Sequence, residues 1–383
     1  MDLIYLDNSA STPLCGAAVE AMRDAVGVFA NPASVHAAGA EASALLERAR
    51  ADILDCAGAG RDYRLVFCGS GSEANNLALL GTLRSGKHFP SKKVIITDSE
   101  HPSVSACAER AEKEGFETVR IPTRGGKLDT GELRRALSGG AALVSLMLVN
   151  NETGALYDVA SAAAAVRELS PGTLVHCDAV QGFMREKLPF GSADMISVSA
   201  HKIGGPKGIG ALFVSESVFT RKALTPVIYG GGQEYGLRSG TSNTIYAAGF
   251  AAAVRETKEQ IAADPGALSR LGLYARERIT AAGCRINAPE KGVPYIVSVT
   301  IPGIKSQVML GFLSAKGICV SAGSACSSKN RRLSGSLLAF GLSPADADCT
   351  VRVSLSARNT EKEIDALAAA LAEGCEKLVK IRK

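Results

Sequence analysis

The sequence of 383 residues predicts an α/β protein, with a mostly parallel central sheet in a large domain and a smaller α+β domain. Apolar, strand-like runs alternate with helical patterns over residues 65–149, which is typical of a parallel sheet covered by helices on both faces. Near residue 258 this pattern changes to short strands followed by helices. We therefore expect a large domain over residues 16–258 and a small domain formed by residues 1–15 and 259–383.

Each expected element follows from a local pattern. Short apolar runs bounded by turn residues predict strands, and longer amphipathic stretches predict helices. The expected strands are 4–6, 65–67, 94–97, 118–120, 143–149, 173–177, 194–199, 211–214, 296–301, 318–320 and 350–356. The expected helices are 17–26, 40–55, 74–83, 104–114, 131–137, 243–262, a short helix near 337, and 361–378.

The composition is that of an ordinary globular protein. Hydrophobic residues make up 46% and charged residues 21%, and the formal charge of +5 is small and dispersed, so nothing favours nucleic acid as a partner. The N-terminus lacks a secretory pattern and no apolar run is long enough to span a membrane, so we expect a cytoplasmic protein. The ten cysteines should be thiols, and because none form a Cys-x-x-Cys pair we predict no metal site.

Lys202 lies between an apolar strand and a turn rich in glycine, residues 204–210. A lysine at the end of a buried strand loses part of its hydration, which lowers its pKa and makes a Schiff base with a carbonyl compound feasible. The alternative is a lysine that only caps the turn. The choice depends on the other residues that the fold brings to the same place.

A second turn, residues 68–73 with the sequence CGSGSE, leads into the helix expected over 74–83. Glycine and serine at a helix N-terminus offer N–H groups and hydroxyls at the positive end of the helix dipole, which suits a phosphate. The turn matches neither the Walker loop nor the Gly-x-Gly-x-x-Gly motif, so a nucleotide is not favoured. A helix that is merely capped remains the alternative.

Polar residues follow several of the expected strands, where parallel sheets collect their reactive groups. Asp178 ends a strand that should be buried, and a buried carboxylate needs a positive partner to stay charged. His101 shares this edge, although a single histidine often has only a structural role. Arg352 lies within an apolar strand, where it would pair with a substrate carboxylate or with an internal acid.

Cys326 lies among glycine, serine and basic residues in the segment 321–332. Such surroundings favour a reactive thiolate, whereas Cys319, within a strand, is a structural contrast. A buried lysine, a phosphate turn, a buried aspartate and a histidine at one edge are together the requirements of pyridoxal phosphate.

Eight segments strongly resemble motifs of the cysteine desulfurases, which are class V aminotransferase-like enzymes with the fold of type I pyridoxal phosphate enzymes. They occur in the family's order along nearly the whole chain. They are LDNSASTP (6–13), NPAS (31–34), SEH (99–101), VNNETG (149–154), HCDAVQ (176–181), HK (201–202), RSGT (238–241) and GSAC (323–326).

The resemblance implies a role for each matching residue. Lys202 would bind the cofactor as a Schiff base, His101 would stack on its ring and help to move protons, and Cys326 would take the sulfur of L-cysteine as a persulfide. The other cofactor contacts implied are Gly71, Ser72, Asp178, Gln181, Ser199, His201 and, toward a partner subunit in a homodimer, Thr241. The implied substrate contacts are Asn151 and Arg352.

The resemblance also implies partners, namely a sulfur-acceptor protein such as an iron–sulfur scaffold, with a cluster contact at Cys326. The loop pattern around Cys326 resembles the scaffold-serving, long-loop type. Two departures are present: the phosphate turn has Gly71 and Ser72 where the family commonly has alanine and threonine, and little chain follows the last helix, which leaves the acceptor open. The alternatives are a selenocysteine lyase, another aminotransferase-type enzyme of this family, or a noncatalytic binding protein with the same fold.

Overall fold

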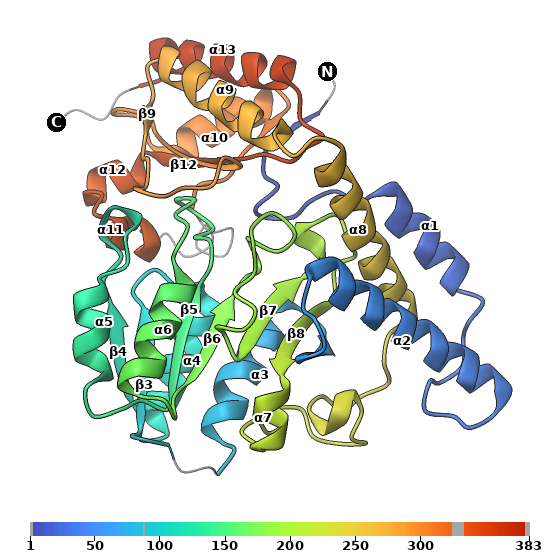
Figure 1. The fold of residues 1–383 in the computed structure, drawn as a ribbon. Coiled ribbons are helices and arrows are strands. Elements are labelled where there is room, and N and C mark those ends of the chain that lie inside the picture. The colour runs from blue at the N-terminus through green and yellow to red at the C-terminus, as the bar shows by residue number, and fades with distance from the viewer. Residues whose placement is uncertain (1–2, 87–88, 324–332, 380–383) are drawn as a thin grey trace.

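The computed structural model describes residues 3–86, 89–323 and 333–379, and its elements form two groups (Figure 1). The larger group surrounds a seven-stranded sheet, and the smaller surrounds a three-stranded sheet. The helix α8 (Thr244–Ala263) runs along the larger group toward the smaller one. The expected α/β class is confirmed, while the exact domain limits stay a prediction.

The large sheet is mostly parallel, as the sequence predicts. Its strand order is β2-β8-β7-β6-β5-β3-β4, and only β8 runs antiparallel to its neighbours. The strands are β2 (Tyr63–Cys68), β3 (Lys93–Thr97), β4 (Glu117–Ile121), β5 (Leu143–Met147), β6 (Leu174–Asp178), β7 (Met195–Ser199) and β8 (Gly210–Ser215).

The strands lack hydrophobic alternation because helices bury both faces of the sheet. Leu65 and Ile95 belong to one hydrophobic cluster, whereas the neighbouring residues Val66 and Ile96 belong to the other. One face packs on α3 (Gly71–Leu83) and α4 (Pro102–Lys113), with α7 (Glu216–Thr220) at its edge. The other packs on α2 (Ala37–Ala57), α5 (Thr130–Leu137), α6 (Val159–Leu169) and α8, with α1 (Gly16–Ala25) against α8.

The smaller group contains an antiparallel sheet of order β12-β10-β9. Beside it, β1 (Ile4–Tyr5) pairs in parallel with β11 (Ile318–Cys319), so the start of the chain lies among C-terminal elements. The sheet strands are β9 (Arg285–Ile286), β10 (Ile296–Thr300) and β12 (Thr350–Ser354). The helices are α9 (Ala267–Ala281), α10 (Ser306–Ala315), α11 (Gly335–Phe340), α12 (Pro344–Asp348) and α13 (Glu361–Lys377).

The sequence patterns did not predict α6, α7, α9, α10 or α12. In α9 the apolar pattern is interrupted by Gly272, and the structure explains this residue: a Cβ there would come 2.3 Å from the carbonyl oxygen of Pro294. The helix therefore uses a glycine for close packing at a position where a glycine lowers helix propensity. Close contact between elements has overridden the local signal.

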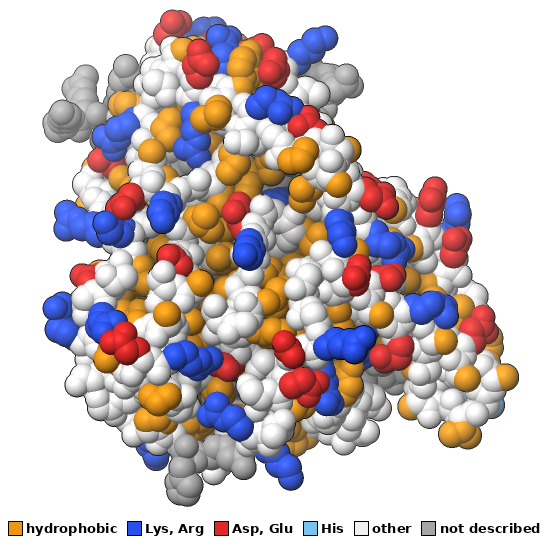
Figure 2. Space-filling model, viewed as in Figure 1, with side chains coloured by type: hydrophobic (Ala, Val, Ile, Leu, Met, Phe, Trp, Pro, Cys, Tyr) orange, Lys and Arg blue, Asp and Glu red, His pale blue; other side chains and the backbone are white. Residues whose placement is uncertain are grey.

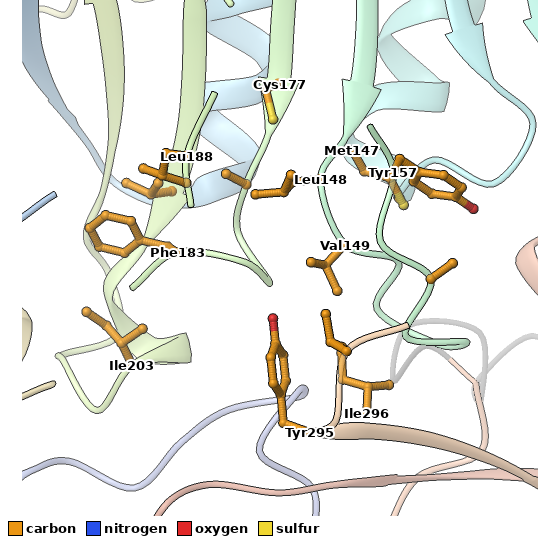
Figure 3. Packing of buried hydrophobic residues seen from close by; sticks show 14 of the residues in the cluster. Met147, Leu148, Val149, Tyr157, Cys177, Phe183, Leu188, Ile203, Tyr295 and Ile296 are labelled. Atoms are coloured by element: carbon orange, nitrogen blue, oxygen red, sulfur yellow. The ribbon is translucent and has the colours of Figure 1, made fainter. Parts of the chain in front are cut away.

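Apolar residues join the two groups of elements. Figure 3 shows Tyr295 and Ile296 of the smaller group facing Phe183, Leu148 and Val149 of the larger one. The Tyr295 side chain points toward the large sheet with its hydroxyl foremost. This contact brings the small sheet close to the ends of β5 and β6.

The surface has no large field of one charge on the face drawn in Figure 2, where acidic and basic side chains are interspersed. Within the described ranges, no helix is long and apolar enough to cross a membrane.

Candidate active site

A cavity of about 260 Å³ opens at the carboxyl ends of β5, β6 and β7, next to the start of α3. Parallel strands direct the residues that follow them to the same edge of the sheet, which explains why distant motifs meet here. The cavity is lined by ten residues singled out from the sequence, Gly71, Ser72, His101, Asn151, Asp178, Gln181, Ser199, His201, Lys202 and Arg352.

Lys202 ends a short 3₁₀ turn, Ala200–Lys202, directly after β7. Its ammonium donates to the carbonyl oxygens of Ser9 and, at 3.0 Å, Ala10. Burial, and next the positive charge of Arg352, lower the pKa of Lys202 to about 8. The expected loss of hydration is therefore present, and a substantial fraction of neutral amine exists near pH 8.

Asp178 is the last residue of β6 and is 6% exposed. Its Oδ2 accepts a hydrogen bond of 2.7 Å from Asn75 Nδ2, and its Oδ1 accepts one of 3.0 Å from the Val180 backbone N–H. These donors orient the carboxylate without neutralising it. A positively charged ligand atom would thus be stabilised beside Asp178.

His101 is the N-cap of α4, and its Nδ1 accepts a hydrogen bond of 3.2 Å from the Ser103 backbone N–H. The Ser103 hydroxyl lies 2.8 Å from the same nitrogen and also accepts from Asn75 at 2.8 Å. Burial lowers the pKa of His101, with the Asp178 charge acting against this shift. A neutral ring with an accepting Nδ1 carries its proton on Nε2.

The turn before α3 is built for close approach. A Cβ on Gly71 would lie 2.7 Å from Val180 Cγ2 and 3.3 Å from Ser199 Cβ, so a larger residue would intrude on the ends of β6 and β7. The Ser70 hydroxyl caps the helix by accepting from Glu73 N–H at 3.1 Å. The first turn of α3 thus lies directly against the cavity wall.

Glu73 fixes this turn from both sides. Its Oε2 accepts from the Gly69 N–H at 2.9 Å, and its Oε1 pairs with Arg238 at 2.9 Å. His201 also lines the cavity; its Nδ1 lies 3.3 Å from the Ser11 hydroxyl, and burial lowers its pKa to about 4. His201 is therefore neutral near pH 7 and can serve as a hydrogen-bonding group.

Arg352, in the middle of β12, is 3% exposed. Of the two partners that the sequence allows, a substrate carboxylate or an internal acid, the structure shows the internal acid. Nη2 of Arg352 lies 2.8 Å from Asp7 Oδ1, and its Nη1 donates to the Asn151 carbonyl oxygen at 2.8 Å. The ion pair stabilises the buried guanidinium. Its Nε has no partner within the described residues and remains a donor for a ligand.

Unpaired polar atoms gather around this cavity. Among the described residues, buried side-chain atoms without a hydrogen-bond partner include Ser9 Oγ, Asn75 Oδ1, Gln181 Oε1, Ser199 Oγ and Arg352 Nε, all from cavity-lining residues. Leaving a buried polar group unpaired is unfavourable by roughly 1–3 kcal/mol. The residues present therefore fit a polar, phosphate-bearing ligand such as pyridoxal phosphate.

The two remaining predicted site residues are Thr241 and Cys326. Thr241 is exposed in the segment before α8. Cys326 lies outside the described residues, so its place is a prediction. Of the described residues that flank this gap, Gly323 lies close to Glu152, which also accepts a hydrogen bond from Ser334.

Several residues of the site were not predicted from the sequence. Asn75 was visible only as a polar residue in the first turn of a helix, and its contact with Asp178 depends on the tertiary fold. Asp7 and Ser9 belong to a recognised motif, but nothing local indicated that they contact Arg352 and Lys202.

Comparison with known proteins agrees with this architecture. The model of the family Aminotransferase class-V matches residues 4–367. A protein named cysteine desulfurase from Frankia sp. (strain EuIK1) is 36% identical, over 94% of this chain and 88% of its own. A solved NifS-like protein superposes with a TM-score of 0.90 at 30% identity, covering 98% of this chain and 100% of its own.

Another solved structure, titled SspA in complex with cysteine, superposes with a TM-score of 0.78 at 29% identity and covers 93% of this chain and 99% of its own. The matches extend over nearly the whole chain, so they include both sheets and the cavity between them. The chain belongs to the class V aminotransferase family, and it is a pyridoxal-phosphate-dependent enzyme of the cysteine desulfurase type.

Proposed function

We propose that this protein is a cysteine desulfurase, which removes sulfur from L-cysteine to give L-alanine and a persulfide on Cys326. The observation that carries the proposal is Lys202, a lysine with a lowered pKa in a cavity ringed by unpaired polar atoms. Relatives named cysteine desulfurase, and a solved relative bound to cysteine, support the choice of substrate.

The residues around the cavity divide the binding of pyridoxal phosphate among them. Lys202 would bind its aldehyde carbon, Asp178 its ring nitrogen and Gln181 its ring hydroxyl, with His101 against the ring. Gly71, Ser72, Ser199 and His201 would bind the phosphate. The bound cofactor supplies an electron sink for negative charge that develops on the substrate α-carbon.

Proton transfer falls to Lys202 and His101. A lysine whose pKa is about 8 has a useful neutral fraction at physiological pH and can accept the α-proton of the substrate. His101, whose burial lowers its pKa, is assigned to help move the proton of the substrate thiol or of Cys326. Its hydrogen bonds to Ser103 fix the ring orientation for that role.

Arg352 and Asn151 are assigned to the substrate carboxylate. Arg352 is anchored by Asp7 on one nitrogen, while its Nε is free to donate. A carboxylate at this position would replace the missing partner, and hydrogen bonds between charged groups are among the stronger ones in proteins. This contact would orient the α-carbon toward Lys202.

The sulfur step belongs to Cys326. Its thiolate attacks the substrate sulfur, a sulfur–sulfur bond forms, and the carbon–sulfur bond breaks with its electron pair left on carbon. Protonation of the carbon fragment completes L-alanine. The persulfide then passes its outer sulfur to an acceptor protein, for which we propose an iron–sulfur scaffold that contacts the chain near Cys326, in the manner of the long-loop type.

We assign a homodimer as the working form, in which Thr241 reaches the phosphate of the partner subunit. Thr241 is exposed in the single chain, and so are Phe29 (88%) and Val35 (103%) between α1 and α2, together with Tyr229 (73%). Burial of such apolar side chains between two copies of the chain would favour their association. We also propose a cytoplasmic location for the protein. The proposed domains are a large one over residues 16–258 and a small one formed by residues 1–15 and 259–383.

The test is a comparison of Cys326→Ala with Cys319→Ala. The Cys326→Ala protein should keep the yellow absorbance of its cofactor but form no persulfide and release little L-alanine from L-cysteine. The Cys319→Ala control, changed in the short strand β11, should behave like the unaltered protein. Unchanged sulfide and alanine release by Cys326→Ala would refute the assignment of the sulfur step to Cys326.

A further inference from the structure

Arg185, in the segment between β6 and β7, contacts the main chain of Lys202. Its Nη2 donates a hydrogen bond of 2.9 Å to the Lys202 carbonyl oxygen. The same oxygen accepts a bond of 3.0 Å from the Thr12 hydroxyl. Two side chains from distant segments therefore fix the backbone from which the Lys202 amine reaches the cavity.

Arg185 also connects this turn with the smaller group of elements. Its guanidinium carbon lies 4.9 Å from the ring centre of Tyr295, a distance suited to a cation–π contact. Tyr295 is 1% exposed, and its hydroxyl donates to the Gln181 carbonyl oxygen at 3.3 Å. As Figure 3 shows, the ring projects from the small-sheet side toward the large sheet.

The charge of Arg185 is favoured by the nearby Glu186 but is not held in a direct ion pair by any described residue. In the part of the chain that the structure describes, Arg185 forms no ion pair, although Glu186 follows it in sequence. Burial disfavours the charged guanidinium and lowers its pKa. A buried cation that forms no direct ion pair is unfavourable for stability alone, which points to a role in the neighbouring site.

We propose that Arg185 is a positioning residue for Lys202: it clamps the backbone of the lysine turn, and by stacking on Tyr295 it ties that turn to the small sheet. The docked position of Tyr295 is thereby linked to the direction in which the lysine side chain points. Misplacement of a reacting group by about 1 Å can slow a reaction on the order of 100-fold. Holding the backbone of Lys202 in place should therefore affect the reaction rate.

The charges around Lys202 make the role measurable. Lys202 is surrounded by Arg352 and Arg185, which disfavour its protonated form, and by Asp7 and Asp178, which favour it. Replacing Arg185 with a neutral residue removes one of the two cations. The proton affinity of Lys202 should then rise, whereas replacing Arg185 with lysine, which keeps the charge, should not raise it.

The experiment compares Arg185→Met, Arg185→Lys and the matched control Thr12→Val in the cofactor-loaded protein. Thr12→Val removes the other donor to the same carbonyl without changing charge. The readouts are the pH midpoint of the visible cofactor absorbance and the separate values of kcat and KM for L-cysteine. A third readout uses cofactor-free protein: the pH dependence of Lys202 acylation, followed by peptide mass spectrometry.

We expect Arg185→Met to lower kcat about 10-fold with KM changed less than about twofold, and to move both pH profiles upward. Arg185→Lys should recover the unaltered midpoint and much of kcat. Thr12→Val should lower kcat without moving the midpoint. If Arg185→Met does not fold, Arg185→Gln replaces it, because glutamine keeps a hydrogen-bond donor but has no charge. The pH midpoint of the cofactor absorbance should then move upward in Arg185→Gln.

The inference is wrong if the neutral variants keep the midpoint and kcat of the unaltered protein. It is also wrong if Met and Lys replacements are equally impaired with an unmoved midpoint, since that would be a packing effect. The kinetic part rests on the proposed function, whereas the absorbance and acylation readouts do not. A protein that fails to act on L-cysteine would refute the proposed function and leave these readouts to decide the role of Arg185.

Discussion

Asp7 Oδ1 lies 2.8 Å from Arg352 Nη2, although 345 positions separate the two residues in sequence. The contact becomes possible because β1 lies beside β11 and the residues after it approach β12. The same segment supplies the carbonyl oxygens of Ser9 and Ala10 to Lys202. One short N-terminal segment thus positions both the proposed carboxylate-binding arginine and the lysine.

The first prediction concerns Arg352→Gln. Losing the guanidinium should raise KM for L-cysteine by about 10- to 100-fold, because a hydrogen bond to a charged group contributes about 1.5–3 kcal/mol. Steady-state kinetics measure the change, and visible absorbance checks that cofactor is retained. Arg358→Gln, which removes an exposed arginine paired with Glu256, is the control and should leave KM unchanged. An equal rise in both variants would argue against a carboxylate contact at Arg352.

The second prediction concerns the protonation of Lys202 itself. Because burial and Arg352 lower its pKa to about 8, the amine should become nucleophilic more than two pH units below an ordinary lysine. Acylation of the cofactor-free protein, measured per peptide by mass spectrometry from pH 6 to 11, should be half-maximal for Lys202 near pH 8. Lys207, exposed on the same turn, provides the internal reference for reagent reactivity. Identical profiles for the two lysines would contradict the prediction.

The third prediction concerns Glu100, a carboxyl that is 7% exposed behind His101. Burial is the main cause that raises its pKa from 4.5 to about 8, despite hydrogen bonds from Thr97 at 2.7 Å and Met147 N–H at 2.9 Å. A folded-state pKa above the unfolded value stabilises the protein fully below about pH 4.5. That contribution is lost as pH rises toward 8.

Glu100→Gln should remove this loss, since the amide stays neutral. Urea unfolding at pH 5 and pH 8.5 should show a smaller decrease in the free energy of unfolding for Glu100→Gln than for the unaltered protein. Comparing the two proteins at each pH cancels the contribution of other groups, such as the buried His176, whose pKa is lowered to about 4. Parallel pH curves would mean that Glu100 is already ionised in the folded state.

The fold was predictable because its signals are local and repeated. Continuous apolar strands between helical patterns gave the parallel sheet, and both faces of strands such as β3 are indeed buried. The strand ends then brought His101, Asp178 and Lys202 to one cavity, as the topology of such sheets requires. The residues that belong to recognisable motifs were found for this reason.

The remaining parts depend on contacts that no local pattern carries. Arg185 looks like a surface residue in sequence, yet it lies between Lys202 and Tyr295. Helix α9 was missed because Gly272 serves packing against Pro294 at the expense of helix propensity. Long-range packing decides such positions, so they become visible only when the chain is folded.

The last prediction compares Asn75→Ala with Asn76→Ala, adjacent residues in the first turns of α3. Asn75 donates to Asp178 Oδ2 at 2.7 Å, so its loss leaves this carboxylate less well oriented beside the cofactor ring. Asn76 instead donates to the Ser72 carbonyl oxygen at 2.8 Å on the exposed side of the helix. Both changes put the same residue type into the same helix.

Asn75→Ala should raise the dissociation constant for pyridoxal phosphate by about 10-fold, which corresponds to the 1.5 kcal/mol or so expected for a hydrogen bond to a carboxylate. Asn76→Ala should change it by less than about twofold. Equilibrium dialysis against increasing cofactor, with absorbance detection, measures both constants. If the two variants bind equally well, Asp178 does not need its Asn75 partner to hold the cofactor, and the orientation of that carboxylate must come from the Val180 backbone N–H alone.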